Sequence, residues 1–105
     1  MLYAQVHLAL PAWIHDAFDP QTVCDDDDAK VAFAIELSRR NIAHESGGPF
    51  GAAVFDETSG RLLGIGVNRV LPQSCSVAHA EMMAYMTTQS RMQRSRLNED
   101  GARIV

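Results

Sequence analysis

Two short apolar segments joined by a turn decide the fold, in the stretch FGAAVFDETSGRLLGIGV (residues 50–67). Residues 50–56 are small and apolar, which is typical of a buried strand, and residues 61–67 have the same character. The turn at residues 58–60 is short enough to return the second segment beside the first as an antiparallel hairpin. Glycines at positions 51, 64 and 66 are unusual inside strands and indicate close approach of another backbone or a ligand.

Helical segments flank this hairpin. Residues 28–44 repeat apolar side chains at helical spacing. The row expected to be buried comprises Val31, Ile35, Ser38 and Ile42, broadened by Phe33 and Leu37. The acidic run at residues 25–28 is interpreted as favourable charge at the helix start, with a cation site as the alternative. The Gly-Gly-Pro segment (residues 47–49) is expected to end the helix, with a glycine in the left-handed exit conformation.

A second helix is expected over residues 79–92, after a loop at residues 69–77. Its methionines have helical spacing, which favours core packing over metal or redox chemistry. Residues 93–101 are polar and form a connector, and residues 102–105 begin another strand. The order helix, strand, strand, helix, strand predicts an α/β/α layered domain.

Composition limits the functions available to the chain. The 105 residues suffice for one small domain, with 47% hydrophobic residues and a net charge of −4. That charge, without a large basic cluster, argues against a nucleic-acid surface, and the sequence lacks the apolar run that a membrane span needs. The two cysteines do not make a disulfide framework, which favours a reducing cytoplasm. Residues 1–24 are expected to be an arm that packs through Trp13, Ile14 and Phe18.

The segment SVAHAEMMAYM (residues 76–86) carries the clearest chemistry. A neutral imidazole such as His79 is a common zinc ligand, and Glu81 beside a metal-bound water could carry its proton. Residues two apart on a regular helix point to different sides, so the pair can cooperate only in the first turn. There the free N–H groups and the helix dipole favour hydroxide and an oxyanion. A partly buried histidine and a surface glutamate opening an ordinary helix are the alternative.

Asn68 directly follows the second strand of the hairpin. Its amide offers a donor and an acceptor, which suits the polar edge of a nucleobase. An ordinary turn asparagine is the alternative.

Taken together, the first helix, GGPFGA (residues 47–52), the hairpin, NR (residues 68–69) and AHAE (residues 78–81) resemble the cytidine deaminase-like superfamily. Within it they look most like the purine branch of bacterial guanine deaminases and tRNA adenosine deaminases, over about residues 28–92. The resemblance implies a three-layer α/β/α fold with a mixed sheet, represented here by its helix-strand-strand-helix-strand N-terminal portion. The implied division is an N-terminal arm (residues 1–24) and a deaminase-like domain (residues 25–105).

The same resemblance implies zinc-dependent hydrolytic deamination of a purine base or related aminoheterocycle, guanine to xanthine and ammonia first. By that resemblance His79 would bind Zn²⁺, and Glu81 would shuttle a proton from the zinc-bound water to the ring nitrogen and then to the leaving ammonia. The backbone of Ala80 would face a substrate carbonyl. Asn68 would hydrogen-bond the purine edge, and Phe50 would line the site or stack on the base. The expected partners are a small-molecule purine and a second copy of the chain in a homodimer, with neither membrane nor nucleic acid.

The pattern departs from the family in one respect. Zinc deaminases carry an H-x-E half and a later P-C-x-x-C half, and residues 1–105 contain only the first. A catalytic zinc normally takes three protein ligands, so we expect the N-terminal part of a longer deaminase, inactive alone. Cys75 and Cys24 are weaker candidates for substitute ligands. The segment CSV (residues 75–77), where relatives commonly have Asp-Pro-Thr, leaves substrate choice open.

Two other functions remain as alternatives. One is a tRNA adenosine deaminase-like editing enzyme, which the acidic balance disfavours. The other is a metal-free remnant acting only as a structural or dimerisation module.

Overall fold

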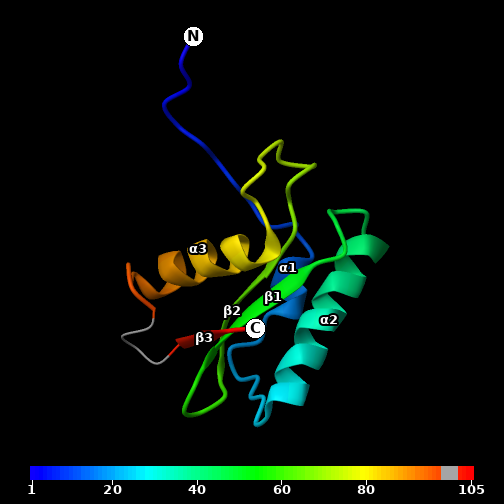
Figure 1. Cartoon of the computed structure of the whole chain (residues 1–105), viewed down its shortest axis with the longest axis vertical. Helices are drawn as coiled ribbons and strands as arrows, with labels where there is room; N and C mark the ends of the chain where they lie inside the picture. The colour runs from blue at the N-terminus through cyan, green and yellow to red at the C-terminus, as the bar shows by residue number, and fades with distance from the viewer. Residues whose placement is uncertain (98–101) are drawn as a thin grey trace.

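A three-stranded sheet lies between two helices in the computed structural model, which describes residues 1–97 and 102–105 (Figure 1). The elements are α1 (Ile14–Ala17), α2 (Asp27–Ala43), β1 (Gly51–Asp56), β2 (Leu62–Val67), α3 (Ala80–Met92) and β3 (Ala102–Ile104). The strand order is β2-β1-β3, and both neighbours of β1 run antiparallel to it. The predicted α/β layers, hairpin and third strand are therefore confirmed. Part of the predicted connector, residues 98–101, lies outside the described residues.

Strand β1 is buried on both faces because alternate side chains point to opposite sides of the sheet. Ala53 and Phe55 pack with Leu37 of α2 in one core cluster. Ala52 and Val54 belong to a second cluster with Ala84 of α3. The strand therefore reads as a continuous apolar run, and it holds the two helices at a fixed separation.

Two strand glycines bring the helices onto the sheet. A Cβ atom added to Gly51 would lie 2.6 Å from the carbonyl oxygen of Ala34 in α2. On the other face, a Cβ on Gly66 would lie 2.3 Å from the nitrogen of Ala84 in α3. The predicted close approach of a backbone is confirmed at these two positions. At the third predicted position, Gly64, the nearest group is instead the side chain of Thr88 in α3.

The ends of α2 confirm one prediction and correct another. Asp26 is the N-cap, and its side chain accepts a hydrogen bond from the Ala29 nitrogen at 2.7 Å. The acidic run thus stabilises a helix start, as interpreted from the sequence. At the other end the left-handed residue is Glu45 (φ 53°) and not a glycine, so that prediction is wrong. The glycines that follow are needed for a close approach to the site described below.

The buried face of α2 differs in part from the predicted one. Leu37 is buried and Phe33 packs against the core, as expected, but the predicted main row is not buried. Val31, Ile35 and Ile42 are 46%, 61% and 51% exposed, whereas Lys30, Leu37 and Asn41 are buried. The two rows are offset by one residue, a rotation of about 100° around the helix axis. The apolar pattern pointed to the wrong row because two of the three buried positions carry polar side chains. Lys30 places its ammonium 5.9 Å from the centre of the Phe55 ring, and Asn41 forms the network described below.

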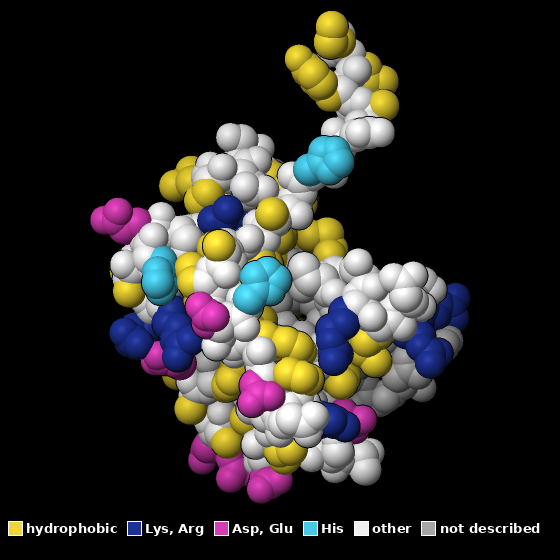
Figure 2. All heavy atoms as spheres, turned by 180° about the vertical axis from the view of Figure 1, so that it is seen from behind, with side chains coloured by type: hydrophobic (Ala, Val, Ile, Leu, Met, Phe, Trp, Pro, Cys, Tyr) yellow, Lys and Arg dark blue, Asp and Glu magenta, His cyan; other side chains and the backbone are white. Residues whose placement is uncertain are grey.

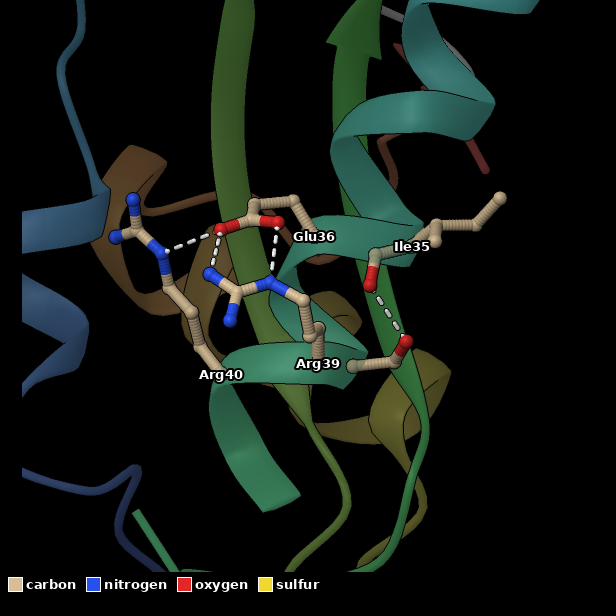
Figure 3. A network of polar contacts seen from close by, with 5 residues as sticks. Ile35, Glu36, Arg39 and Arg40 are labelled. Carbon is tan, nitrogen blue, oxygen red and sulfur yellow. Dashed lines mark hydrogen bonds and ion pairs between the residues drawn. The ribbon is translucent and has the colours of Figure 1, made fainter. Parts of the chain in front are cut away.

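An ion-pair cluster occupies the exposed face of α2 (Figure 3). The Glu36 carboxylate accepts hydrogen bonds from Arg39 and Arg40, which lie three and four residues further along the helix. These hydrogen bonds, Arg39 first, lower the pKa of Glu36 to about 2. The predicted pair of Glu36 with Arg40 is confirmed, at 3.2 Å.

The lowered pKa of Glu36 predicts a small acid-dependent stability. A carboxyl group with a depressed pKa in the folded state contributes its stability above the unfolded pKa, near 4.5, and loses it as the pH falls toward 2. Glu36→Gln should therefore flatten the pH dependence of the free energy of unfolding in this window, through a loss of stability at pH 7 that disappears toward pH 2. The loss should be small because the group is exposed. Urea unfolding at pH 2.5 and pH 7 checks this. An unchanged slope in the variant would contradict it.

The N-terminal arm contacts the domain from Ala9 onward. Its first residues extend away from the body (Figures 1 and 2). Ile14 is buried in the α2-side core, and Phe18 packs against the same cluster. The indole ring of Trp13 stacks on His44, with ring centres 5.2 Å apart. The expected packing of the arm is confirmed, while its boundary at residue 24 stays a prediction.

Candidate active site

The start of α3 presents the predicted histidine and glutamate together. His79 is the N-cap residue in an extended conformation (φ −71°, ψ 159°), and its side chain makes no capping hydrogen bond. The imidazole is exposed and is therefore open to a ligand. Ala80 is buried, and Glu81 is exposed in the first helical turn. The first-turn geometry that cooperation of this pair requires is present.

Two contacts place this helix entrance at the end of β2. The Arg69 nitrogen donates a hydrogen bond to the Ala78 carbonyl oxygen at 2.8 Å, which ties the chain after β2 to the residue before His79. A Cβ on Gly66 would lie 2.5 Å from the Ala80 carbonyl oxygen, so the first turn of α3 rests directly on the strand. The positions of Asn68 and of the helix entrance are thereby linked through the backbone.

Asn68 is 8% exposed and is held by hydrogen bonds of its side-chain oxygen and of its backbone. Its Oδ1 accepts from the nitrogens of Gly48 (3.4 Å) and Val70 (3.2 Å), and its backbone nitrogen donates to the Phe50 carbonyl oxygen at 3.2 Å. Within the described residues the side-chain Nδ2 has no such hydrogen bond, so its two donors are the part of the amide left for a ligand. The amide was expected to offer both a donor and an acceptor, but the structure already engages the acceptor.

Phe50 is 58% exposed and lies beside the glycine loop. A Cβ on Gly48 would be 3.3 Å from Asn68 Oδ1 and 3.5 Å from a ring carbon of Phe50. The structure therefore brings Asn68, Gly48 and Phe50 together as one group. Phe50 also lines a shallow groove beside Val31 and Ile35 of α2.

The described residues do not complete a metal site. Residues 1–97 and 102–105 contain no group of three or more His, Cys, Asp or Glu side chains that could hold a metal ion. Cys24 and Cys75 are free thiols. The Cys24 nitrogen donates to the Gly60 carbonyl oxygen, at the opposite end of the six-residue strand β2 and thus about 20 Å from the helix entrance. Cys24 cannot join His79 at one metal, and burial raises the pKa of its thiol.

The structure adds two residues that the sequence reading missed. Arg69 donates to the Ser46 carbonyl oxygen (2.6 Å) and to the Ala9 carbonyl oxygen (3.0 Å), and partial burial lowers the pKa of its guanidinium. Asn41 is fully buried in α2 and bonds to the glycine loop. An asparagine inside a helix is a weak helix former, and this was the available signal for Asn41.

An apolar cavity elsewhere does not belong to this site. It lies between α1, β2 and α3 and is lined by residues such as Ile14, Phe18, Ile65 and Arg91. The Arg91 guanidinium sits 5.1 Å from the centre of the Phe18 ring. Few polar groups converge there to orient a base, which a specific pocket requires.

Residues 25–104 match the family described as the cytidine and deoxycytidylate deaminase zinc-binding region, and the chain belongs to this family. No curated protein was found to match the chain.

Solved structures agree with this assignment. Guanine deaminase from Nitrosomonas europaea is 36% identical, with a TM-score of 0.86, over 99% of this chain and 58% of that one. NE0047 in complex with 2,6-diaminopurine is 39% identical, with a TM-score of 0.85, over 93% of this chain and 53% of that one. Guanine deaminase from Bacillus subtilis, 23% identical with a TM-score of 0.67, shares the fold over 75% of this chain and 48% of that one. The chain thus spans about half the length of these proteins, and the predicted superfamily and fold class are confirmed.

The helices in the described part of the chain are all too short or too polar to cross a membrane.

Proposed function

We propose that this chain is the N-terminal part of a zinc-dependent hydrolytic deaminase acting on a purine base, with guanine as the favoured substrate. The deaminase family supports the reaction class, and structures similar to this one bind 2,6-diaminopurine and 8-azaguanine. The observation that carries the proposal is the juxtaposition of the Asn68 group with the His79–Glu81 helix entrance. It rests on the Arg69–Ala78 hydrogen bond and on the contact of Gly66 with α3.

The proposed roles follow from how each side chain is held. Asn68 Nδ2 is free to donate to acceptors on the purine edge, and the exposed Phe50 ring can cover the base. The backbone of Ala80 would face a substrate carbonyl. Glu81, exposed in the first turn, would take one proton from the attacking water and deliver it to the ring nitrogen. It would then pass the second proton, from the added hydroxyl group, to the amino group as the C–N bond breaks and ammonia leaves. Guanine and water then give xanthine and ammonia.

His79 is the proposed zinc ligand of this chain. Its imidazole is exposed and free of capping duty, which suits coordination. Zinc supplies a Lewis acid that makes water a nucleophile near neutral pH. One histidine does not hold a catalytic zinc, so the remaining ligands would lie outside residues 1–97 and 102–105.

Ammonia release from candidate substrates tests the proposal. The zinc-loaded full-length protein should release ammonia from guanine and leave tRNA adenosine unchanged. On the face in Figure 2, Lys and Arg side chains lie in separate groups, which gives little support for a tRNA surface. Inosine formation in tRNA would establish the editing alternative instead. A zinc-bound protein inactive on both would leave the structural remnant.

Replacing Asn68 tests the base-binding role. Asn68→Ala should weaken binding of 8-azaguanine by about 10- to 100-fold, because a site built to hydrogen-bond a ligand loses its fixed donor. Isothermal titration of the zinc-loaded protein measures this change. Gln73→Ala, in the exposed loop that follows, removes another side-chain amide and should leave the affinity unchanged. Equal affinities in wild type and Asn68→Ala would place the base elsewhere.

We further propose that the protein is a cytoplasmic homodimer, with residues 1–24 as its arm and residues 25–105 within the deaminase domain. The exposed apolar residues Val31, Ile35 and Ile104 support a covered surface on this domain. Light scattering on the full-length protein tests the oligomeric state.

A further inference from the structure

The Asn41 side-chain amide uses both of its donors, and its oxygen accepts one hydrogen bond. It is 0% exposed in the interior of α2. Its Nδ2 donates to the carbonyl oxygens of Gly48 (2.8 Å) and Asn68 (3.0 Å), and its Oδ1 accepts from the Ser46 hydroxyl at 2.7 Å. The amide therefore links Gly48 to Asn68, which belong with Phe50 to the proposed base-binding group.

Two carbonyl oxygens, which can only accept, require the Asn41 Nδ2 group to face them, and contacts from the N-terminal arm support the same orientation. Trp13 Nε1 donates to Ser46 Oγ at 2.8 Å, and an indole N–H can only donate. The Ser46 oxygen accepts from Trp13, and its own hydroxyl donates to Asn41 Oδ1 at 2.7 Å, with the Asn41 backbone carbonyl oxygen as a longer contact at 3.3 Å. With Oδ1 facing Ser46, the Nδ2 group must face the two carbonyls. Trp13, Ser46 and Asn41 thus form a directed chain of donors.

The spacing of the two segments depends on this amide. A Cβ on Gly47 would lie 1.8 Å from the Asn68 carbonyl oxygen and 2.7 Å from Asn41 Nδ2, so the loop passes at the closest distance a backbone allows. Above this contact the Gly48 nitrogen bonds to Asn68 Oδ1. A shift of the Asn41 amide would therefore move Gly48 and Asn68 relative to each other.

We propose that Asn41, oriented by Ser46 and Trp13, is a positioning residue that fixes the Asn68 amide for binding a purine base. The proposal rests on the proposed function and gives the arm a part in it. This relay of Trp13, Ser46 and Asn41 contacts no reacting atom. It acts by holding the open Nδ2 donors of Asn68 in one orientation. This reduces the conformational entropy that the Asn68 side chain loses when a base binds.

Removing the hydroxyl in the middle of the relay is the sharpest test. Ser46→Ala leaves the backbone contact of Ser46 with Arg69 intact but leaves Asn41 Oδ1 and Trp13 Nε1 without this partner. We expect 8-azaguanine to bind about fivefold to tenfold more weakly. The signals of the Gly48 backbone amide and the Asn68 side-chain amide should shift in nitrogen–proton NMR spectra.

A matched control lies on the same helix. The Ser38 hydroxyl also bonds to a carbonyl oxygen, that of Ile35 at 2.6 Å, but makes no hydrogen bond to Trp13, Ser46 or Asn41. Ser38→Ala should leave both the affinity and the two NMR signals as in wild type. If Ser46→Ala does not fold, Trp13→Phe removes the N–H donor and keeps a smaller aromatic ring beside His44. The same weakening and signal shifts are expected.

The outcomes separate the two proposals. The relay is supported if Ser46→Ala or Trp13→Phe binds 8-azaguanine more weakly than wild type and Ser38→Ala binds it equally well. Equal binding by wild type and the relay variants overturns the relay and leaves the purine function standing. If zinc-loaded wild type does not bind 8-azaguanine, the purine function fails and the relay's role in it fails too.

Discussion

Replacing Glu81 with glutamine is expected to lower kcat for guanine deamination by about 10²- to 10⁴-fold. Glutamine keeps the size and polarity of the side chain but cannot accept a proton from water and pass it on. The helix should be unaffected, because the Glu81 side chain is exposed in the first turn of α3. Steady-state ammonia release by the zinc-loaded full-length protein measures the effect.

The matched control is Glu57→Gln, at an exposed position in the turn between β1 and β2. It makes the same change of charge on the surface and should leave kcat unchanged. Zinc content and 8-azaguanine affinity of Glu81→Gln should stay close to wild type, which separates proton transfer from binding. A Glu81→Gln enzyme with wild-type kcat would remove Glu81 from the chemistry.

The second large effect concerns Gly66. An alanine there would place its Cβ 2.3 Å from the Ala84 nitrogen and 2.5 Å from the Ala80 carbonyl oxygen. Both atoms are helix backbone and cannot rotate away, so α3 must move off the sheet. We expect Gly66→Ala to lower the free energy of unfolding by about 3 kcal/mol, at the upper end for overpacked cores. Urea denaturation of the 105-residue chain measures it.

Gly48→Ala provides the comparison for Gly66→Ala. Its new Cβ would have Asn68 Oδ1 as its nearest neighbour at 3.3 Å, so a small adjustment accommodates it. The stability loss should be much smaller than for Gly66→Ala. Equal stability of Gly66→Ala and wild type would show that α3 does not rest on β2 at this point, and the link between Asn68 and His79 would lose one of its two contacts.

The parts of the fold that follow from local pattern were predictable. The hairpin shows in small apolar runs around a turn, and the strand glycines correctly indicated close backbone approach, as at Gly51 and Gly66. The buried face of α2 was not predictable in this way. Counting apolar residues selected Val31 and Ile35, whereas the sheet contacts the row that contains Asn41.

The candidate site divides along the same line. His79 and Glu81 are two residues apart, and a helix start between them is a local feature, so the sequence located them; their roles stay predictions. The contacts of Asn41 and Arg69 join residues far apart in the chain, up to the 60 residues between Arg69 and Ala9. Such contacts depend on how the elements pack, and single-segment patterns do not contain that information.

The central claim is that His79 binds the zinc ion beside which Glu81 works, and zinc content measures it most directly. Elemental analysis of the purified full-length protein should find one zinc per chain in wild type and in Glu81→Gln. His79→Ala should contain only a trace. Stoichiometric zinc in His79→Ala, or none in wild type after incubation with zinc, would contradict the claim.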